Sequence, residues 1–399
     1  MTDHTARRTA RRTHGFTESV IRDMTRVARE TGAINLAQGF PDFPAPDVLK
    51  EAACRAIADD VNQYAVTWGS PRLRTALAAK YASRYGMRVD EAREITVTCG
   101  ATEAMAAVVL ALIDPGEEIL IFEPFYENYG PDAILCDARP VFVPLAPDGS
   151  LDLDRLRAAV GPRTRAIILN SPNNPTGHVL RTGELEAVAR LCVEHDLLAI
   201  TDEIYEHILY EGAHIPLATI PGMRQRTITV SGFSKTFSVT GWRVGTIVAP
   251  ADLTAAIRKV HDFLTVGAPA PLQEACAAGL ELLGDDYYEG LAREYQERRD
   301  ALVPALQAAG FRCVAPQGAY YVLADFSDLS ERDDVNYATW LAGGGSEGED
   351  SGPGVAAVPG SSFHHEPGRG SSLVRFAFCK RVETLRAAGE RLMAVAREA

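Results

Sequence analysis

Lys235 is the residue of this sequence whose surroundings most favour covalent chemistry. It follows the apolar segment TITVSG and lies in a run of small residues from Gly232 to Gly245, GFSKTFSVTGWRVG. A lysine after a strand is usually a surface residue, because ammonium groups are seldom buried without a partner. Here the small neighbours let a ligand approach the backbone, and Arg243 supplies a permanent planar cation suited to phosphate. The segment predicts a reactive lysine beside a phosphate site.

A glycine turn after the apolar segment EITVTC offers a second anion site. The free N–H groups and the dipole at the start of the following helix favour an anion, and phosphate is the usual one. Many α/β proteins turn on glycine and cap with threonine, so the turn alone would be only structural. Together with the lysine segment it predicts a phosphate cup, formed by Gly100, Ala101, Thr102, Ser234 and Arg243.

Two further apolar segments end in polar residues. RAIILNSPNNPTG places Asn170 and Asn174 at such an end, although Asn-Pro is also common in plain turns. LLAITDEIYEH places Asp202 at the end of its apolar run, with Tyr205 close behind. A buried carboxylate is costly unless a cation meets it, and the protonated ring nitrogen of a cofactor is such a cation.

The elements that must position these residues alternate along the chain from about Ile95. Short apolar runs alternate with helical patterns, which indicates a mostly parallel sheet covered on both faces. The expected strands are EITVTC, EEILIFEP, RAIILNSP, LLAITDE and TITVSG. A helix is expected near Tyr126, and the spacing of residues 19–31 predicts another helix before this region. Open α/β sheets bind ligands outside the carboxyl ends of their strands, where all four polar groups would meet. A lysine for a Schiff base, an acid for a pyridinium nitrogen and an arginine for a phosphate suit pyridoxal 5′-phosphate.

The pattern changes after about Thr246, where long helical stretches give way to a mixed region of strands and helices. The expected fold class is therefore α/β, with a three-layer large domain around a mostly parallel sheet and a smaller α+β domain. The N-terminal arm and the C-terminal part would form this smaller domain. The expected ranges are a disordered tail at 1–15, the arm at 16–46, the large domain at 47–285 and the small domain at 286–399, with a flexible, glycine-rich insert at 343–354.

Composition excludes several classes of protein. The 399 residues are 46% hydrophobic and 23% charged, with a net charge of −13, so no global positive field exists to collect nucleic acid or anionic lipid. The longest apolar stretch, Ala104 to Ile113, is too short to span a bilayer. Seven scattered cysteines, without a CxxC pattern or a Cys/His cluster, predict reduced thiols in the cytoplasm and no metal site.

The sequence resembles the class I/II, fold-type I pyridoxal phosphate aminotransferases from about Phe16 to the C-terminus. Closest in pattern are the kynurenine and glutamine transaminase K branch and the bacterial methionine aminotransferases. Seven motifs in order carry the resemblance: NLAQGFPDFPAP, NQYAVTWGSPRLR, EPFYENY, NSPNNPTG, TDEIYE, SGFSKTFSVTGWRVG and LVRFAFCK. Each motif is modestly specific, whereas the ordered set is very specific.

The resemblance implies roles for the residues singled out above. Lys235 would hold the cofactor as a Schiff base and move a proton as general base and acid. Asp202 would keep the pyridine nitrogen protonated, while Tyr205 and Asn174 would hydrogen-bond the phenolic oxygen of the cofactor. Tyr126 would stack on the ring, with the neighbouring Phe125 as a substitute.

The resemblance also implies the partners of the site. Arg375 would grip the α-carboxylate of the substrate, with Asn174 and the backbone of Gly39 beside it, although an arginine in an apolar strand also fits a buried ion pair. Tyr64 would reach the phosphate from a second subunit, which predicts a homodimer with shared active sites. The expected reaction moves the amino group of an L-amino acid to a 2-oxo acid.

The expected donor is a neutral, sulfur-containing or aromatic amino acid, because the sequence shows no obvious second arginine for a distal carboxylate. Trp68, Phe16 and His364 are candidates for the side-chain pocket, and each is also an ordinary packing residue. The kynurenine branch carries a tryptophan on its N-terminal helix, where this chain has Val20 and Ile21.

Two other functions fit parts of the sequence. A carbon–sulfur β-lyase, or a specialised biosynthetic enzyme on the same scaffold, would use the same cofactor and lysine. A ligand-sensing domain of a DNA-binding regulator is disfavoured, because only a short tail precedes Phe16.

Overall fold

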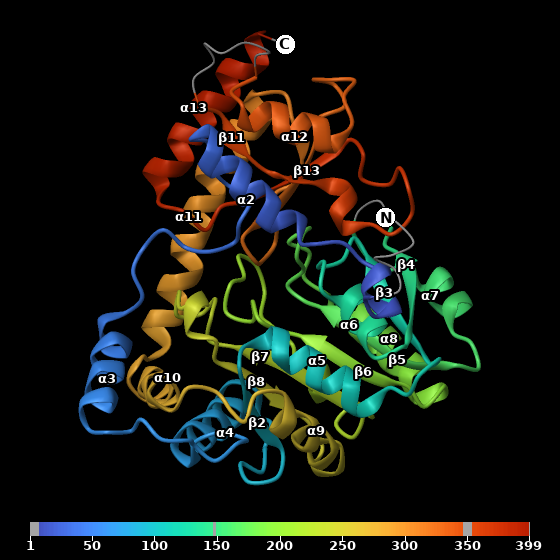
Figure 1. Ribbon diagram of the computed structural model, residues 1–399, viewed down its shortest axis with the longest axis vertical. Helices are drawn as coiled ribbons and strands as arrows, with labels where there is room; N and C mark the ends of the chain where they lie inside the picture. Colours follow the sequence, from blue (N-terminus) through green and yellow to red (C-terminus); the bar gives the residue numbers. More distant parts are fainter. Residues whose placement is uncertain (1–7, 147–148, 346–352, 399) are drawn as a thin grey trace.

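The computed structural model describes residues 8–146, 149–345 and 353–398, and its centre is a seven-stranded sheet (Figure 1). The strands follow the order β2-β8-β7-β6-β5-β3-β4. All neighbours pair in parallel except β8, which runs antiparallel to both β2 and β7. Their bounds are β2 (Ile95–Thr98), β3 (Glu118–Glu123), β4 (Arg139–Pro144), β5 (Thr164–Asn170), β6 (Leu198–Asp202), β7 (Thr227–Gly232) and β8 (Gly245–Val248).

Helices cover both faces of this sheet and give the three layers. In β5, Ile168 packs into the core on one face, while its neighbour Ile167 packs into the core on the other. Burial on both faces explains why these strands are almost continuously apolar. The helices on the first face are α5 (Ala101–Leu112), α6 (Tyr129–Leu135) and α9 (Ala251–Leu264). Those on the other are α7 (Leu153–Ala159), α8 (Thr182–Glu194), α3 (Asp47–Ala58), α4 (Pro71–Tyr85) and α10 (Ala270–Leu282).

A second, smaller unit contains both the beginning and the end of the chain. Its antiparallel sheet has the order β12-β13-β10-β9, and β1 pairs in parallel with β11. Figure 1 shows α2 lying among these C-terminal elements. The bounds are α2 (Val20–Thr31), β1 (Ile34–Asn35), α11 (Asp285–Ala308), β9 (Arg312–Cys313), β10 (Tyr321–Asp325), α12 (Asp334–Ala342), β11 (Val355–Ala356), β12 (Val358–Pro359), β13 (Leu373–Ala377) and α13 (Val382–Glu398).

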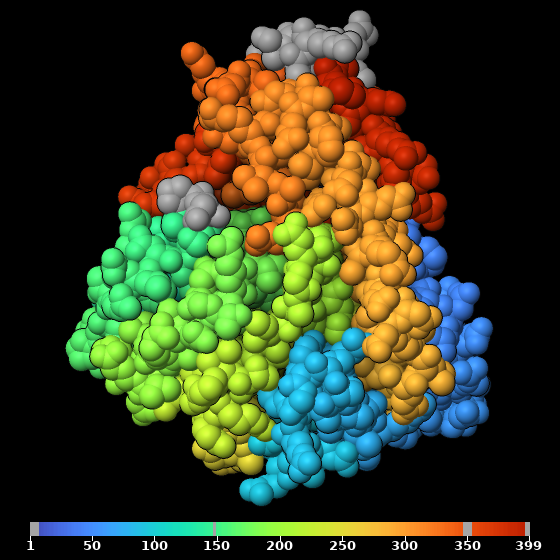
Figure 2. All heavy atoms as spheres, turned by 180° about the vertical axis from the view of Figure 1, so that it is seen from behind, coloured from blue at the N-terminus to red at the C-terminus, as the bar shows by residue number. Residues whose placement is uncertain are grey.

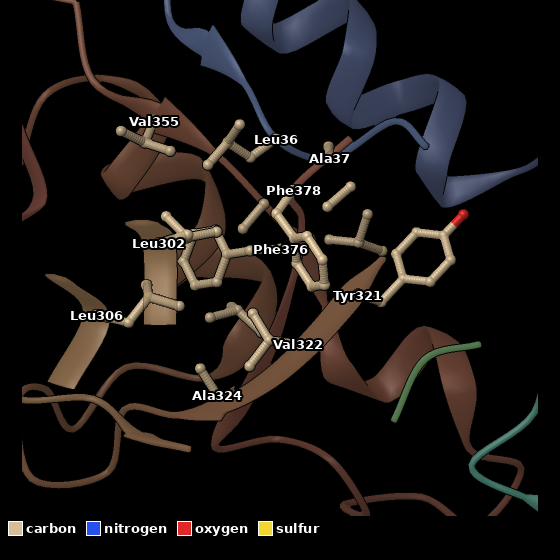
Figure 3. Close-up of a cluster of buried hydrophobic side chains, with 14 of the residues drawn as sticks. Leu36, Ala37, Leu302, Leu306, Tyr321, Val322, Ala324, Val355, Phe376 and Phe378 are labelled. Atoms are coloured by element: carbon tan, nitrogen blue, oxygen red, sulfur yellow. The ribbon is translucent and has the colours of Figure 1, made fainter. Parts of the chain in front are cut away.

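The core of the smaller unit joins segments from opposite ends of the sequence. Leu36 and Ala37, which follow β1, pack with Val322 of β10, Phe376 of β13 and Phe378 (Figure 3). All five are fully buried. Seen from behind, α11 runs as an orange column from the C-terminal part down beside the blue N-terminal helices (Figure 2). The N-terminal arm is therefore held in place by the end of the chain.

The α/β fold class and its mostly parallel sheet are confirmed, and three details differ from expectation. β4 and the four-residue β8 were not among the expected strands. The helix expected near Tyr126 begins at Tyr129. Within the tail expected at 1–15, Arg11–His14 form a 3-10 turn. Arg12 fixes this turn by donating a hydrogen bond to the carbonyl oxygen of Leu135 (2.9 Å).

The structure does not test two further expectations, the flexible insert and the domain boundaries. Residues 1–7 of the expected tail and 346–352 of the expected insert lie outside the described residues. The boundaries between the two domains remain a prediction. Within the described parts of the chain, every helix is too short or too polar to cross a membrane, and the His, Cys, Asp and Glu side chains form no group of three that could hold a metal ion.

Candidate active site

The carboxyl ends of four strands meet at one edge of the large sheet. β5, β6 and β7 run parallel, and β2 is parallel to them because β8 is antiparallel to both β2 and β7. Gly245, the first residue of β8, lies opposite Thr98 of β2 and Gly232 of β7. The short strand β8 therefore begins where its two neighbours end. This register places Arg243 beside the loops that follow β2 and β7.

A pocket of about 480 Å³ lies at this edge. Its volume is within the range of about 300–1,000 Å³ that is usual for small-molecule and cofactor sites. Most of the predicted site residues line it, although they come from motifs spread over the whole chain: Gly39, Ala101, Thr102, Tyr126, Asn174, Asp202, Tyr205, Ser234, Lys235, Arg243 and Arg375.

The predicted phosphate cup depends on two glycines. Gly100 has a φ of +83°, and a Cβ atom there would lie 2.3 Å from a terminal nitrogen of Arg243. A Cβ at Gly245 would lie 2.6 Å from the backbone nitrogen of Ala101. Only glycine at both positions allows this approach. It leaves the guanidinium beside the first turn of α5, whose N–H groups at Ala101 and Thr102 have no partner within the helix.

Lys235 lies in the turn after β7, next to the buried Ser234. Its Nζ atom donates a hydrogen bond to the carbonyl oxygen of Gly39 (3.2 Å) and lies 5.9 Å from the ring centre of Tyr205 and 5.6 Å from that of Tyr320. Burial lowers the pKa of Lys235 to about 8. A larger share of this amine is therefore neutral near pH 8 than in an ordinary lysine, which makes it a better nucleophile.

Asp202 ends β6 and is buried. One carboxylate oxygen accepts a hydrogen bond from the hydroxyl of Tyr129 (2.7 Å), and the other accepts one from the backbone N–H of Ile204 (3.3 Å). Burial raises the pKa of Asp202, although these hydrogen bonds and the charge of Lys235 oppose the shift. The carboxylate is thus oriented but has no cation in direct contact among the described residues, and this fits a protonated ring nitrogen as its partner.

Tyr205 belongs to a group of buried phenols with Tyr320 and Tyr321, and it lines the pocket together with Tyr321. Its hydroxyl lies 2.9 Å from that of Tyr321, and the hydroxyl of Tyr320 donates to the carbonyl oxygen of Gly39 (2.8 Å). In Figure 3 the hydroxyl of Tyr321 points away from the aliphatic side chains of the core. Burial raises the pKa of Tyr205 well above its ordinary value, so the phenol stays protonated and can donate.

Arg375 is the most unusual charge of the site, because only 1% of its surface is exposed. One terminal nitrogen donates to the side-chain oxygen of Asn174 (2.9 Å), and the other donates to the carbonyl oxygen of Ala37 (2.5 Å). Its Nε atom has no partner, and no carboxylate pairs with it among the described residues. The buried ion pair considered as an alternative is therefore wrong. A buried arginine with an unused donor suits an anionic ligand.

The two aromatic residues of the EPFY motif occupy different positions in the structure. Tyr126 lines the pocket, where its ring packs edge-on against that of Tyr129 with 5.7 Å between ring centres. Phe125 is buried instead against Phe142, with 4.9 Å between ring centres. Of the two rings, Tyr126 is the one that lines the pocket.

Among the predicted residues, Gly100 and Phe125 do not line the pocket, and neither do Tyr64, Trp68, His364 and Phe16. Tyr64 is 87% exposed, as expected for a residue that would meet a second copy of the chain. Trp68 packs under the guanidinium of Arg258 at 4.9 Å. His364 is half-buried and does not line the pocket, and its partial burial lowers its pKa to about 4. Phe16 is partly exposed.

The sequence analysis missed several residues that line the pocket. Arg22 contradicts the premise that the pocket contains no second arginine. Asp132 is 7% exposed, one of its carboxylate oxygens has no partner, and burial raises its pKa to about 7. The sequence could have indicated Arg22, because its neighbours Val20 and Ile21 were already compared with a residue near the substrate in the kynurenine branch. Tyr129 and Tyr321 were also missed, although they line the pocket and hydrogen-bond to Asp202 and Tyr205. Ser19 and Gln38 are further missed lining residues.

These residues fit pyridoxal phosphate. The pocket offers a cationic cradle that a Cβ at Gly100 would fill, a lysine with a lowered pKa, and a buried acid without a cation. The orphaned donor of Arg375 lies in the same pocket, ready for a carboxylate. A three-layer α/β fold with this set of residues defines a fold-type I enzyme that uses pyridoxal phosphate.

Comparison with known proteins identifies the family to which this chain belongs. The model of the family "Aminotransferase class I and II" matches residues 31–392. The chain belongs to this family, and it is therefore an enzyme with pyridoxal phosphate as its cofactor.

Three of the similar proteins are named for different amino donors. The chain is 42% identical to "Probable N-succinyldiaminopimelate aminotransferase DapC" of Mycobacterium tuberculosis, over 97% of this chain and 98% of that protein. It is 38% identical to the methionine aminotransferase of Escherichia coli (94% and 95%) and 35% identical to human kynurenine–oxoglutarate transaminase 1 (96% and 97%). The solved structure of the M. tuberculosis N-succinyldiaminopimelate aminotransferase matches with a TM-score of 0.92, over 97% of this chain and 100% of that one. The predicted resemblance is confirmed.

Proposed function

We propose that the enzyme moves the amino group of an L-amino acid to a 2-oxo acid, with Lys235 as the residue that binds the cofactor covalently. One observation carries the proposal. Lys235, Asp202, Arg243 and Arg375 line a single pocket, although they belong to four different segments. Together they supply an amine, an acid, a phosphate ligand and a carboxylate ligand.

The cofactor, when bound, supplies an aldehyde that accepts amines and a ring that withdraws electrons. Lys235 then moves a proton to and from the substrate, a role that suits an amine with a pKa of about 8. Asp202, oriented by Tyr129, holds the ring nitrogen protonated. Arg375 fixes the substrate carboxylate, and Asn174 fixes Arg375. Tyr205 donates to the cofactor from its buried position.

The proposal includes a homodimer with shared sites, located in the cytoplasm. The exposed ring of Tyr64 supports the dimer, because a tyrosine that is 87% exposed in one subunit is available to a second subunit. An isolated subunit would then lack one ligand of the phosphate.

The names of the relatives do not decide the amino donor, because one is named for N-succinyldiaminopimelate, one for methionine and one for kynurenine. The expectation of a neutral, sulfur-containing or aromatic donor depended on a pocket without a second arginine. Because Arg22 lines the pocket, this reason for a neutral donor no longer holds.

A spectroscopic experiment tests the proposal. Single L-amino acids are added to the holoenzyme, and the absorbance of the bound cofactor is followed. We expect a donor to convert the cofactor to its amine form, and a 2-oxo acid to restore the original spectrum. Release of ammonia and an oxo acid without any acceptor would instead indicate the β-lyase. A Lys235→Ala variant that still turns over would contradict the proposal.

A further inference from the structure

Arg22 is a cation of the pocket wall that the proposed chemistry does not use. It lies in the first turn of α2 and lines the pocket. Its guanidinium forms no ion pair or hydrogen bond with any other residue that the structure describes. By contrast, Arg26, one turn further along α2, pairs with Asp23 (3.7 Å) and Glu30 (3.3 Å). Arg22 is thus free to bind a ligand.

The other three cations of the described lining each have an assigned partner. Under the proposed function, Arg243 binds the phosphate, Lys235 binds the cofactor aldehyde and Arg375 binds the α-carboxylate of the substrate. Once these groups are assigned, Arg22 is the remaining cation of the described lining without an anion.

The acidic side chains of the pocket do not neutralise Arg22 either. Asp202 accepts the hydroxyl of Tyr129, and Glu127 accepts the hydroxyl of Ser19 (2.5 Å). Asp132 is buried, and this burial raises its pKa to about 7, so that part of it is neutral at physiological pH. The guanidinium therefore offers its donors to the pocket or to solvent.

Two contacts fix α2, and with it Arg22, against the pocket. Ser19 caps the helix by accepting the backbone N–H of Arg22 (3.4 Å), while its hydroxyl donates to Glu127, which also lines the pocket. The hydroxyl of Thr25 donates to the side chain of Gln38 (2.9 Å). The helix is thus tied to the rim of the pocket at two points.

The residues on either side of Gln38 connect this helix to the reacting groups. The carbonyl oxygen of Ala37 accepts from Arg375, and that of Gly39 accepts from Lys235 (3.2 Å). An amino acid held by Arg375 and Lys235 therefore lies beside the segment to which α2 is tied. Its side chain shares the pocket with Arg22.

We propose that Arg22 binds a carboxylate at the far end of the donor side chain, so that the preferred donors are L-amino acids with a distal carboxylate. This inference rests on the proposed transamination and adds its substrate class. Guanidinium and carboxylate groups form paired, charge-assisted hydrogen bonds, which an amide or an alkyl group cannot reproduce.

The test compares matched donors in the reaction with the holoenzyme. L-Glutamate and L-2-aminoadipate carry the distal carboxylate, whereas L-glutamine and L-methionine are neutral. For Arg22→Ala we expect kcat/KM to fall about ten-fold or more with the two carboxylate donors, as the loss of a charge-assisted hydrogen bond predicts. With the neutral donors it should stay within about two-fold of wild type, because no such bond is lost. Arg22→Glu should shift the preference toward L-lysine.

Arg26→Ala is the matched control, since it removes an arginine from the same helix but not from the pocket. It should leave all four donors unaffected. An equal loss with carboxylate and neutral donors in Arg22→Ala, or no loss, would overturn the inference. So would a wild-type enzyme that accepts only neutral donors, although transamination itself would stand. A wild-type enzyme inert to every amino acid would instead contradict the proposed function.

Discussion

The guanidinium of Arg375 donates a hydrogen bond to the side-chain oxygen of Asn174 across 2.9 Å, although the two residues lie 201 positions apart. Asn174 is fixed in turn, because its backbone N–H donates to the side-chain oxygen of Asn170 (2.7 Å) at the end of β5. The large sheet thereby orients an arginine that belongs to β13 of the smaller unit. The substrate carboxylate is thus proposed to bind where the two units meet.

Replacement of Arg375 should mainly impair substrate binding. Arg375→Lys keeps a positive charge but loses the paired donors, so we expect kcat/KM for any reactive amino acid to fall about 100-fold. Cofactor affinity should change little, since the proposed phosphate ligands are elsewhere. Steady-state kinetics and cofactor titration measure the two effects. Arg312→Ala is a control, because this arginine pairs with Asp325 on the surface of the same sheet. Unchanged kinetics in Arg375→Lys would refute the role.

The pKa of Lys235 predicts the pH dependence of cofactor uptake. Only the neutral amine attacks an aldehyde, and burial lowers the pKa of this lysine to about 8. The rate at which apoprotein takes up pyridoxal phosphate should therefore rise with pH up to about 8 and level off above it. An ordinary lysine, with a pKa of 10.5, would show a rate that continues to rise. Absorbance of the bound cofactor gives the rate, and Nα-acetyl-lysine, whose side-chain amine is free, provides the reference. A curve that matches this reference would contradict the prediction.

The sequence predicted the site better than its surroundings. Lys235, Asp202, Asn174 and Gly100 each follow an apolar run, and parallel strands bring their carboxyl ends to one edge, so local pattern plus one rule of sheet topology suffices. This rule applies without β8, which was missed because a run of only four residues, GTIV, gives almost no periodic signal.

The donor pocket was harder to predict, because it depends on how a helix from one end of the chain sits on the rest. The spacing of residues 19–31 predicted α2 correctly, yet not which of its side chains faces the pocket. That is decided by long-range contacts such as the one between Ser19 and Glu127. Trp68 and His364 were wrong choices for the pocket lining for the same reason.

A buried ion pair next to the site predicts a large effect on stability. Glu206, just after Tyr205, accepts hydrogen bonds from Lys80 (2.7 Å), Tyr85 (2.5 Å) and Ser231 (2.7 Å). Burial would raise the pKa of Glu206, but interactions with Lys80, His207 and His214 outweigh this effect and lower the pKa below its ordinary value. The stabilisation is therefore present at neutral pH and is lost only as the pH falls into the acid range.

Lys80→Ala should lower the free energy of unfolding by about 3–5 kcal/mol at pH 7, because it leaves the carboxylate buried without its cation. Denaturant unfolding of the holoenzyme measures the change. Lys259→Ala, an exposed lysine of α9, should change it little. The double variant Lys80→Met/Glu206→Gln should lose less than Lys80→Ala, because both charges are removed together. An equal loss in the single and double variants would show that packing, not charge, is the cause.

Asp132 makes the opposite contribution to stability, because its carboxyl group is buried without a cation. Burial raises its pKa from 3.8 to about 7, so the folded protein resists its ionisation. As the pH rises from about 4 to about 7, ionisation of the unfolded chain should therefore cost the fold up to about 4 kcal/mol. Asp132→Asn keeps the shape and removes the charge. We expect it to raise the free energy of unfolding by about 1–3 kcal/mol at pH 8, and by clearly less at pH 5. Unfolding of wild type and variant at both pH values measures the difference, and a difference independent of pH would show that Asp132 titrates as an ordinary surface carboxylate.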